Sequence, residues 1–237
     1  MATSGITVSQ LTRDQIINAA LRKIGVVGEG VIANATQLAD GQEALNATVL
    51  ELTTFGMPLW KRTELAITLV TGQRTYTIGV GQTINVPFPQ KLSEAVMQVS
   101  GSNSQIDMEI KARYDFNLLP TNSNGTPVSV TYQPFVNYGE LLVWPTPDSS
   151  LPAGSTVAIT YQEPFDVFTS ASETPDFPQE WQQALIYQLA LVLSDDYGLP
   201  VTDKQWLEKQ AEKHISQVLG FGTEEASLFI YPDRGDR

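Results

Sequence analysis

The segment Thr12-Arg13-Asp14-Gln15 places a small oxygen-bearing side chain three positions before a glutamine, and the same spacing recurs at Asn34/Gln37, Asp176/Gln179 and Thr202/Gln205. The first backbone N–H groups of a helix have no partner within the helix, and such a pair of side chains can accept hydrogen bonds from them. Each copy precedes apolar residues at helical spacing. The sequence therefore predicts four helices, two early and two late.

The predicted helices cover about 13–24, 35–55 and 177–197, and the fourth follows Thr202 and ends before Gly220. Gly41 falls inside the second helix, where glycine costs about 1 kcal/mol relative to alanine. We therefore expect a kink or a close helix contact at this position. In the fourth helix, Val201 and Trp206 flank the cap as a hydrophobic staple does, and Trp206 is expected in the core.

Between these pairs of helices the apolar residues alternate with polar ones, which is typical of half-buried strands. Turn residues such as Asn122-Ser123-Asn124-Gly125 separate the alternating segments. Six or seven short antiparallel strands are expected, forming a sandwich or a barrel-like sheet. The alternating residues are Leu65, Ile67 and Leu69, Tyr76 and Ile78, Ile106, Met108 and Ile110, Val128, Val130 and Tyr132, Leu141 and Val143, and Val157, Ile159 and Tyr161.

The predicted fold class is α+β, with a four-helix body that carries a β domain inserted between its second and third helices. Residues 1–62 and 166–220 form the two halves of the helical domain, and residues 63–165 form the inserted β domain. Residues 221–237 form an extended C-terminal tail. This layout is compatible with a protein that contacts several partners through separate surfaces.

The charge of the chain is negative and unevenly distributed. The net charge is −12, and residues 163–237 hold 14 acids and 5 bases whereas residues 1–62 hold 5 of each. Binding to the phosphates of DNA requires clustered lysine and arginine, so tight DNA binding is not expected. The acids either keep the protein soluble or form a surface past which DNA moves without adhering, because like charges repel.

No apolar run approaches the roughly 18 residues of a membrane-spanning helix, and the N-terminal residues lack the pattern of a signal peptide. We therefore expect no membrane partner and assembly in a cytoplasm. The chain has no cysteine, which excludes disulfides, thiolate metal sites and thiol nucleophiles.

The search for catalytic, metal or cofactor residues gives no positive result. The only histidine, His214, has no recognisable partner for a triad or a metal site and is expected to pack or face solvent. Asp195 and Asp196 are adjacent carboxylates at the end of a predicted helix, where the helix dipole disfavours acids. They either face water, which is their ordinary role, or bind an ion or a partner. The glycine-containing stretch 25–30 lacks the Lys-Ser/Thr of a phosphate loop. We therefore expect no enzyme activity and no cofactor.

Several segments in order along the chain are similar to head-to-tail adaptor proteins of short-tailed bacteriophages. These adaptors include the tail tubular protein A type and the packaged-DNA stabilisation proteins. The resemblance is carried by Ile16–Gly25, Leu45-Asn46, Tyr76–Gly79, Leu142–Pro147 and Pro175–Trp181 with Ala184-Leu185.

This resemblance implies a structural protein of the virion at the head-tail junction. It implies a ring of twelve copies between the portal protein and the tail nozzle protein, to which tail fibres attach in some phages. DNA passes through the channel of such a ring without specific binding, and the head is closed after packaging. The family brings no catalytic residues to this sequence.

Two groups of residues are candidates for function in such a ring. The apolar run Leu228, Phe229, Ile230 and Tyr231 near the C-terminus is expected to dock on the portal or on a neighbouring subunit, or else to fold back on the chain's own helices, because burying such side chains stabilises by roughly 1.5 to 3 kcal/mol each. Acids of the late region are expected to face the channel, with Asp195, Asp196, Glu224 and Glu225 as candidates.

Two other classes of function stay open. A carbohydrate-binding or fibre-attachment β module would use exposed aromatic residues in the loops at Pro87–Lys91 and Asn137–Trp144. A hydrolase with a pair of carboxylates is the third possibility, because acids are abundant.

Overall fold

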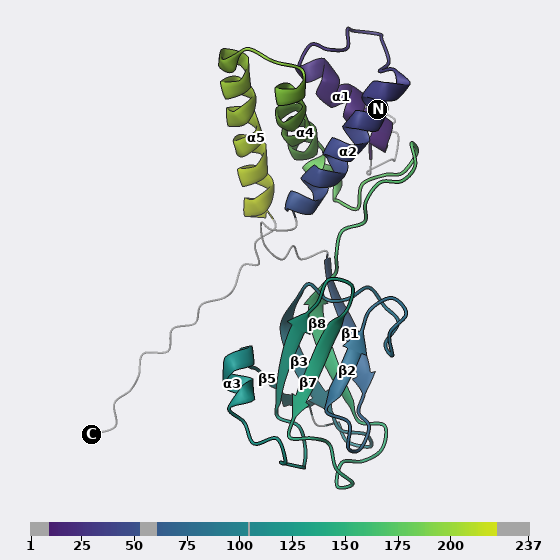
Figure 1. The fold of residues 1–237 in the computed structure, drawn as a ribbon, viewed down its shortest axis with the longest axis vertical. Helices are drawn as coiled ribbons and strands as arrows, with labels where there is room; N and C mark the ends of the chain where they lie inside the picture. Colours follow the sequence, from purple (N-terminus) through teal and green to yellow (C-terminus); the bar gives the residue numbers. More distant parts are fainter. Residues whose placement is uncertain (1–9, 53–60, 104, 222–237) are drawn as a thin grey trace, which may run out of the picture. The chain divides into compact units, whose positions relative to one another are not determined.

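The structure, a computed structural model, describes residues 10–52, 61–103 and 105–221. The chain divides into two compact units, one of residues 1–54 and 166–237 and the other of residues 55–165. The first unit contains the long helices and the second contains two β-sheets (Figure 1). The predicted α+β class is therefore confirmed.

In the helical unit, helix α4 contacts each of the other long helices. Its core includes Ile16, Leu21, Leu45, Leu185 and Leu189, which are fully buried. Burial of each such side chain contributes roughly 1.5 to 3 kcal/mol. The elements are α1 (Arg13–Lys23), α2 (Ala35–Leu52), the 3-10 turn η3 (Gln179–Trp181), α4 (Gln182–Asp196) and α5 (Val201–Phe221).

The first two helix starts confirm the cap prediction. In α1, the Gln15 side chain accepts a hydrogen bond from the Thr12 N–H at 3.0 Å. In α2 the exchange is reciprocal, because Asn34 accepts from the Gln37 N–H and Gln37 accepts from the Asn34 N–H, each at 2.9 Å. Two N–H groups at the start of α2 are thereby satisfied.

The late pair of predicted helix starts was wrong in position. The third predicted helix, α4, begins at Gln182, directly after the 3-10 turn η3. Buried Phe177, which precedes this turn, packs against Trp181 with ring centroids 5.5 Å apart. In α5, Thr202 lies inside the helix, because the Pro200 carbonyl already accepts hydrogen bonds from the Asp203 and Lys204 N–H groups. A proline just before a helix fixes its φ without needing a donor, so it starts α5 earlier than the cap predicts.

Gly41 makes the close helix contact that its position in α2 predicts. A Cβ atom at Gly41 would lie 2.4 Å from Cγ2 of Ile17 on α1. Ile17 is fully buried, so its side chain has little room to move. Glycine at this position thus sets how closely α1 and α2 approach.

The chain returns to the helical unit through a segment that α2 holds by hydrogen bonds. The Asn46 side chain donates to the Phe168 carbonyl at 3.1 Å and accepts from the Phe168 N–H at 2.8 Å. Glu173 accepts from the N–H groups of Ser170 and Thr169 and from the Thr169 hydroxyl, and these bonds lower the pKa of its carboxyl. The Asn46 bonds thus join residues that are more than 100 positions apart in the sequence.

The β unit is a sandwich of two four-stranded sheets, with strand orders β1-β8-β3-β4 and β2-β7-β6-β5. Its core is apolar and includes Ile78, Met97, Leu141 and Ile159. The strands are β1 (Arg62–Thr68), β2 (Thr75–Ile78), β3 (Lys91–Gln98), β4 (Gln105–Asp107), β5 (Glu109–Ile110), β6 (Ser129–Pro134), β7 (Gly139–Trp144) and β8 (Thr156–Gln162), and a short helix α3 (Arg113–Asn117) follows β5.

Three details of the sandwich differ from the expectation. Strand β3 was missed, because a bulge between Leu92 and Glu94 breaks the alternation of buried and exposed residues. The segment around Met108 was predicted as one strand, but β4 and β5 belong to different sheets. Strand β5 runs parallel to β6, so the sheets are not wholly antiparallel. The two separate sheets are a sandwich and not a barrel.

We predict that Gly41→Ala destabilises the protein, although alanine is the better helix former by about 1 kcal/mol. The added methyl group overlaps Ile17, and overpacking of a core costs about 1 to 3 kcal/mol. The net result should be a lower midpoint in urea denaturation. Gly220→Ala in α5 is the matched control, because a Cβ atom there meets nothing within 4 Å. Equal stability of the two variants would contradict this account.

Candidate interaction surfaces

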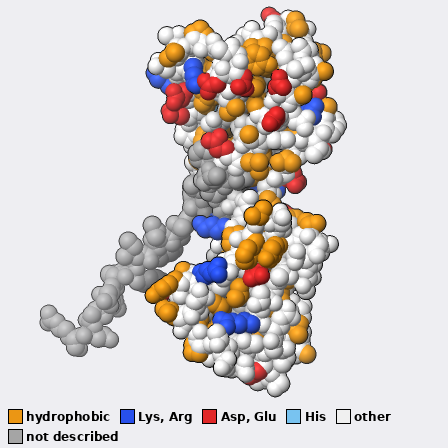
Figure 2. Space-filling view, in the orientation of Figure 1, with side chains coloured by type: hydrophobic (Ala, Val, Ile, Leu, Met, Phe, Trp, Pro, Cys, Tyr) orange, Lys and Arg blue, Asp and Glu red, His pale blue; other side chains and the backbone are white. Residues whose placement is uncertain are grey.

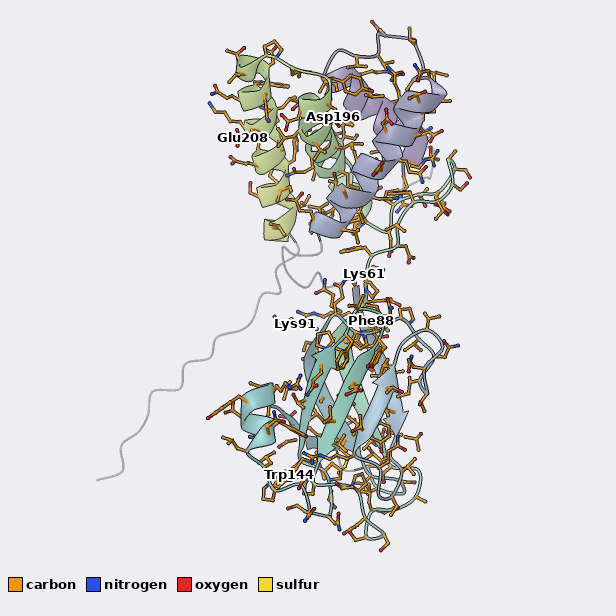
Figure 3. The ribbon with its side chains drawn as sticks, viewed as in Figure 1. Lys61, Phe88, Lys91, Trp144, Asp196 and Glu208 are labelled. Carbon is orange, nitrogen blue, oxygen red and sulfur yellow. The ribbon has the colours of Figure 1, made fainter. Side chains whose placement is uncertain are left out.

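The structure separates the two acids that the sequence places side by side at the end of α4. Asp195 faces α5, where its carboxylate pairs with the Lys204 ammonium group. Asp196 lines a groove between α4 and α2. Both carboxylates are exposed, and Asp196 is labelled in Figure 3. The other predicted functional residues, Glu224, Glu225 and Leu228 to Tyr231, lie outside the described residues.

The groove between α2 and α4 has a largely apolar floor and acidic edges. Ala44, Ala47 and Leu193 contribute to the floor, and Val192, which is 37% exposed, forms part of one wall. The remaining lining residues are Asp40, Glu43, Asp196 and Tyr197.

The hydroxyl group of Tyr197 lies close enough to two acids of the groove for both of them to shift its pKa. Burial raises the pKa of its hydroxyl, and the nearby carboxylates of Asp40 and Asp196 raise it further. Nearby negative charges disfavour a further negative charge on the phenol, which is why both carboxylates shift its pKa in the same direction. The carboxylates of Asp40, Glu43 and Asp196 make no ion pair with any residue in the described part of the chain.

An aromatic cluster lies on another side of α4, centred on the buried Tyr187 ring. His214 of α5 stacks on this ring with centroids 4.9 Å apart, and Trp206 of α5 meets its edge at 6.3 Å. The Lys23 ammonium group of α1 lies 4.9 Å from the centre of the same ring. His214 is thus a packing residue in this cluster, in line with the sequence interpretation.

Trp206 was expected in the core, but this prediction was wrong, because 51% of its surface is exposed. Val201, its predicted staple partner, is 71% exposed. Successive residues of a helix are turned by about 100° around its axis. The side of α5 opposite its buried residues Leu207, Ala211, Ile215 and Val218 therefore carries one tryptophan and two lysines. We call this side the α5 face, and it consists of Thr202, Trp206, Lys209 and Lys213.

The groove and the aromatic cluster lie on opposite sides of α4. Tyr187 and Asp196 are nine residues apart, which corresponds to half a turn in direction around a helix. Figure 2 shows the acidic side chains spread over the viewed face of the helical unit. The helical unit therefore presents an acidic groove on one side and a tryptophan with basic neighbours on the other.

The β unit brings only part of the two predicted carbohydrate-binding loops together. The Tyr132 hydroxyl donates to the Pro89 carbonyl of the first loop, and its ring lies against Gly139 of the second. Phe88 and Trp144 lie at opposite ends of the unit (Figure 3). The Trp144 indole N–H donates to the Pro120 carbonyl at 2.9 Å, so this side chain is held by its own unit. Phe135 and Tyr138 stack on each other at 4.8 Å in the β6–β7 turn.

Within the described ranges, no group of three His, Asp or Glu side chains is placed to hold a metal ion. No helix among the described residues has the length and apolar character needed to cross a membrane. Among the described residues, the groove, the α5 face and the exposed apolar residues of the β unit are candidate contact surfaces.

A comparison with protein-family models gives a match to the SU10 adaptor protein over residues 11–222. This range includes both units of the structure. The chain belongs to the SU10 adaptor protein family. A search of curated proteins finds no match.

Membership of this family gives the protein a structural role as a phage adaptor and a place among virion components. An adaptor acts through contacts with other head and tail proteins. The family is one of structural phage adaptors, which favours reading the surfaces described above as contact surfaces.

We predict that Tyr187 and Trp206 differ in their effect on folding although their rings touch. Tyr187→Ala should lower the free energy of unfolding by about 3 kcal/mol, as for other buried aromatic residues. Trp206→Ala should cost about 1 kcal/mol, since half of its surface is exposed and its main partner is one ring edge. Urea denaturation of the two variants measures both values. A large loss for Trp206→Ala would show that it is a core residue after all.

Proposed function

We propose that this adaptor forms a closed ring of twelve copies between the portal and the tail nozzle, builds the DNA channel and closes the head after packaging. The observation that carries this proposal is the family match over residues 11–222, which covers both the helical and the β unit. In this ring, helices α1, α2, α4 and α5 of the helical unit act as one rigid four-helix body. Residues 63–165 act as an inserted domain that reaches a neighbouring layer of the virion.

A ring requires heterologous contacts, in which one surface of a subunit meets a different surface of the next. The helical unit has two unlike surfaces on opposite sides of α4, which supports this mode of assembly. The sandwich and the C-terminal segment leave further surfaces for partners above and below the ring. Tail fibres are candidate partners of the β unit.

We propose that acids of the helical unit face the channel and discourage adhesion of DNA. The excess of acids in residues 163–237 supports this assignment, and their repulsion would act over about 8 to 10 Å at ordinary salt. The candidates for this role are Asp195, Glu224 and Glu225, while Asp196, the fourth acid expected to face the channel, is assigned below to a contact between copies. A map of the ring that places these acids on its outer surface would remove the basis of this proposal.

Electron microscopy of the purified protein mixed with its portal tests the ring directly. We expect a twelvefold ring seated coaxially on the portal. The β unit expressed alone is the control and should add no ring. A stable dimer that ignores the portal would overturn the proposed function.

We also propose that the apolar run Leu228 to Tyr231 docks on the portal or on a neighbouring subunit. Deletion of residues 223–237 should leave thermal unfolding of the free protein nearly unchanged and abolish its assembly on the portal. Replacing Leu228 and Phe229 by serine in the full chain is the matched variant and should have the same effect. A shortened protein that assembles normally, or that unfolds many degrees lower, would contradict this assignment.

A further inference from the structure

We propose that the α5 face of one copy docks into the α2–α4 groove of a second copy of this chain. The inference rests on the ring proposed above and names the contact that would join its subunits. The residues of the α5 face are Trp206, Lys209 and Lys213 with Thr202, and the groove residues are Asp40, Glu43, Ala44, Ala47, Val192 and Asp196.

Charge complementarity identifies the second copy as the occupant of the groove. The groove presents three carboxylates, from Asp40, Glu43 and Asp196, and the α5 face presents two lysines. In the described part of the chain these lysines have no ion-pair partner. Complementary charges of this kind set the partner and the register of an interface more than its affinity. A strongly acidic partner protein would be repelled by the groove.

The spacing of the charges on the two helices is also matched. Asp40 and Glu43 are three residues apart on α2, and Lys209 and Lys213 are four residues apart on α5. At 1.5 Å per residue, both separations are about one helical turn. Each lysine can therefore meet one carboxylate when the two helices lie side by side.

The apolar parts of the two surfaces complement each other in size. The groove lining contains small residues, Ala44 and Ala47, and Leu50, three positions after Ala47 on α2, is 52% exposed. Trp206 offers a large side chain that is half exposed in the single copy. A tryptophan surrounded by polar residues is the typical residue at the centre of a stable interface. Burial in the groove would cover apolar surface on both copies.

The positions of the two surfaces allow the contact to repeat. The groove lies on one side of α4, and Tyr187 with Trp206 lies on the other. Each copy can therefore place its α5 face in the groove of one neighbour while its own groove holds the α5 face of another. Such a chain of contacts ends only when the ring closes. A contact of this kind is distinct from a dimer, which would use the same surface twice.

Charge reversal tests the contact on the full-length protein under the conditions in which the wild type forms rings. Lys209→Glu with Lys213→Glu makes the α5 face acidic, and Asp40→Lys with Glu43→Lys makes the groove basic. We expect each variant alone to lose ring formation, as measured by electron microscopy and by mass from light scattering. Thermal unfolding should stay within a few degrees of the wild type, because all four positions lie on the surface.

Mixing the two variants in equal amounts gives the sharpest outcome. The acidic face of one variant then meets the basic groove of the other, so rings should return with the two variants alternating. Different tags on the two variants would show equal incorporation. Lys91→Glu with Arg113→Glu is the matched control, since it makes the same change in net charge at exposed positions of the β unit and should assemble normally.

The outcomes separate this inference from the proposed function. If the wild type forms no ring alone or on the portal, the proposed function fails. If the wild type forms rings and both reversed variants also form them, or if mixing does not restore them, the contact inferred here is wrong while the ring stands. Rings that form normally but no longer bind the portal would assign the α5 face to the portal and would equally overturn the inference.

Discussion

The burial of α4 is the constraint on which the helical unit depends. Helices α1, α2 and α5 all pack against it, and eight of its 15 residues are buried. A helix that is buried on most of its sides gains little stability until its neighbours are in place. Two of these neighbours precede the β unit in the sequence and one follows α4. The helical unit therefore forms only when segments separated by more than 100 residues meet, and the Asn46 bonds to Phe168 fix where they meet.

The same helix separates the two surfaces that we propose to join neighbouring copies. Tyr187 supports Trp206 on one side of α4, and Asp196 and Val192 line the groove on the other. Because both surfaces pack against the same helix, α4, the angle between them is set by helix packing and not by loops. In a ring of identical contacts, this angle determines how many copies close it. A small shift of α5 against α4 would therefore change the ring more than a change in any loop.

The sequence predicts the early part of the helical unit well because the signals there are local. The Asn34/Gln37 cap and the close approach at Gly41 involve residues within one helix or between consecutive helices. The late helix starts were misplaced, since Pro200 begins α5 before Thr202. Strand β3 was missed because its bulge removes the period of two on which strand prediction rests.

The candidate surfaces could be predicted only in part. The excess of late acids drew attention to Asp195 and Asp196, but the groove also needs Asp40 and Glu43 from α2, and no local pattern shows that α2 and α4 are neighbours. Trp206 was expected in the core because tryptophan side chains are, on average, highly buried in folded proteins. In the structure it meets Tyr187 only edge to face, while His214 stacks on the Tyr187 ring.

The net charge of the chain explains why a modest contact suits an adaptor of this kind. Each copy carries a net charge of −12, so free copies repel one another. In the ring that we propose, a copy would join its neighbour where basic groups meet acidic ones. The last copy to enter such a ring would make two contacts at once, and the second is effectively intramolecular. A closed ring of this kind would therefore be stable although each single contact is weak.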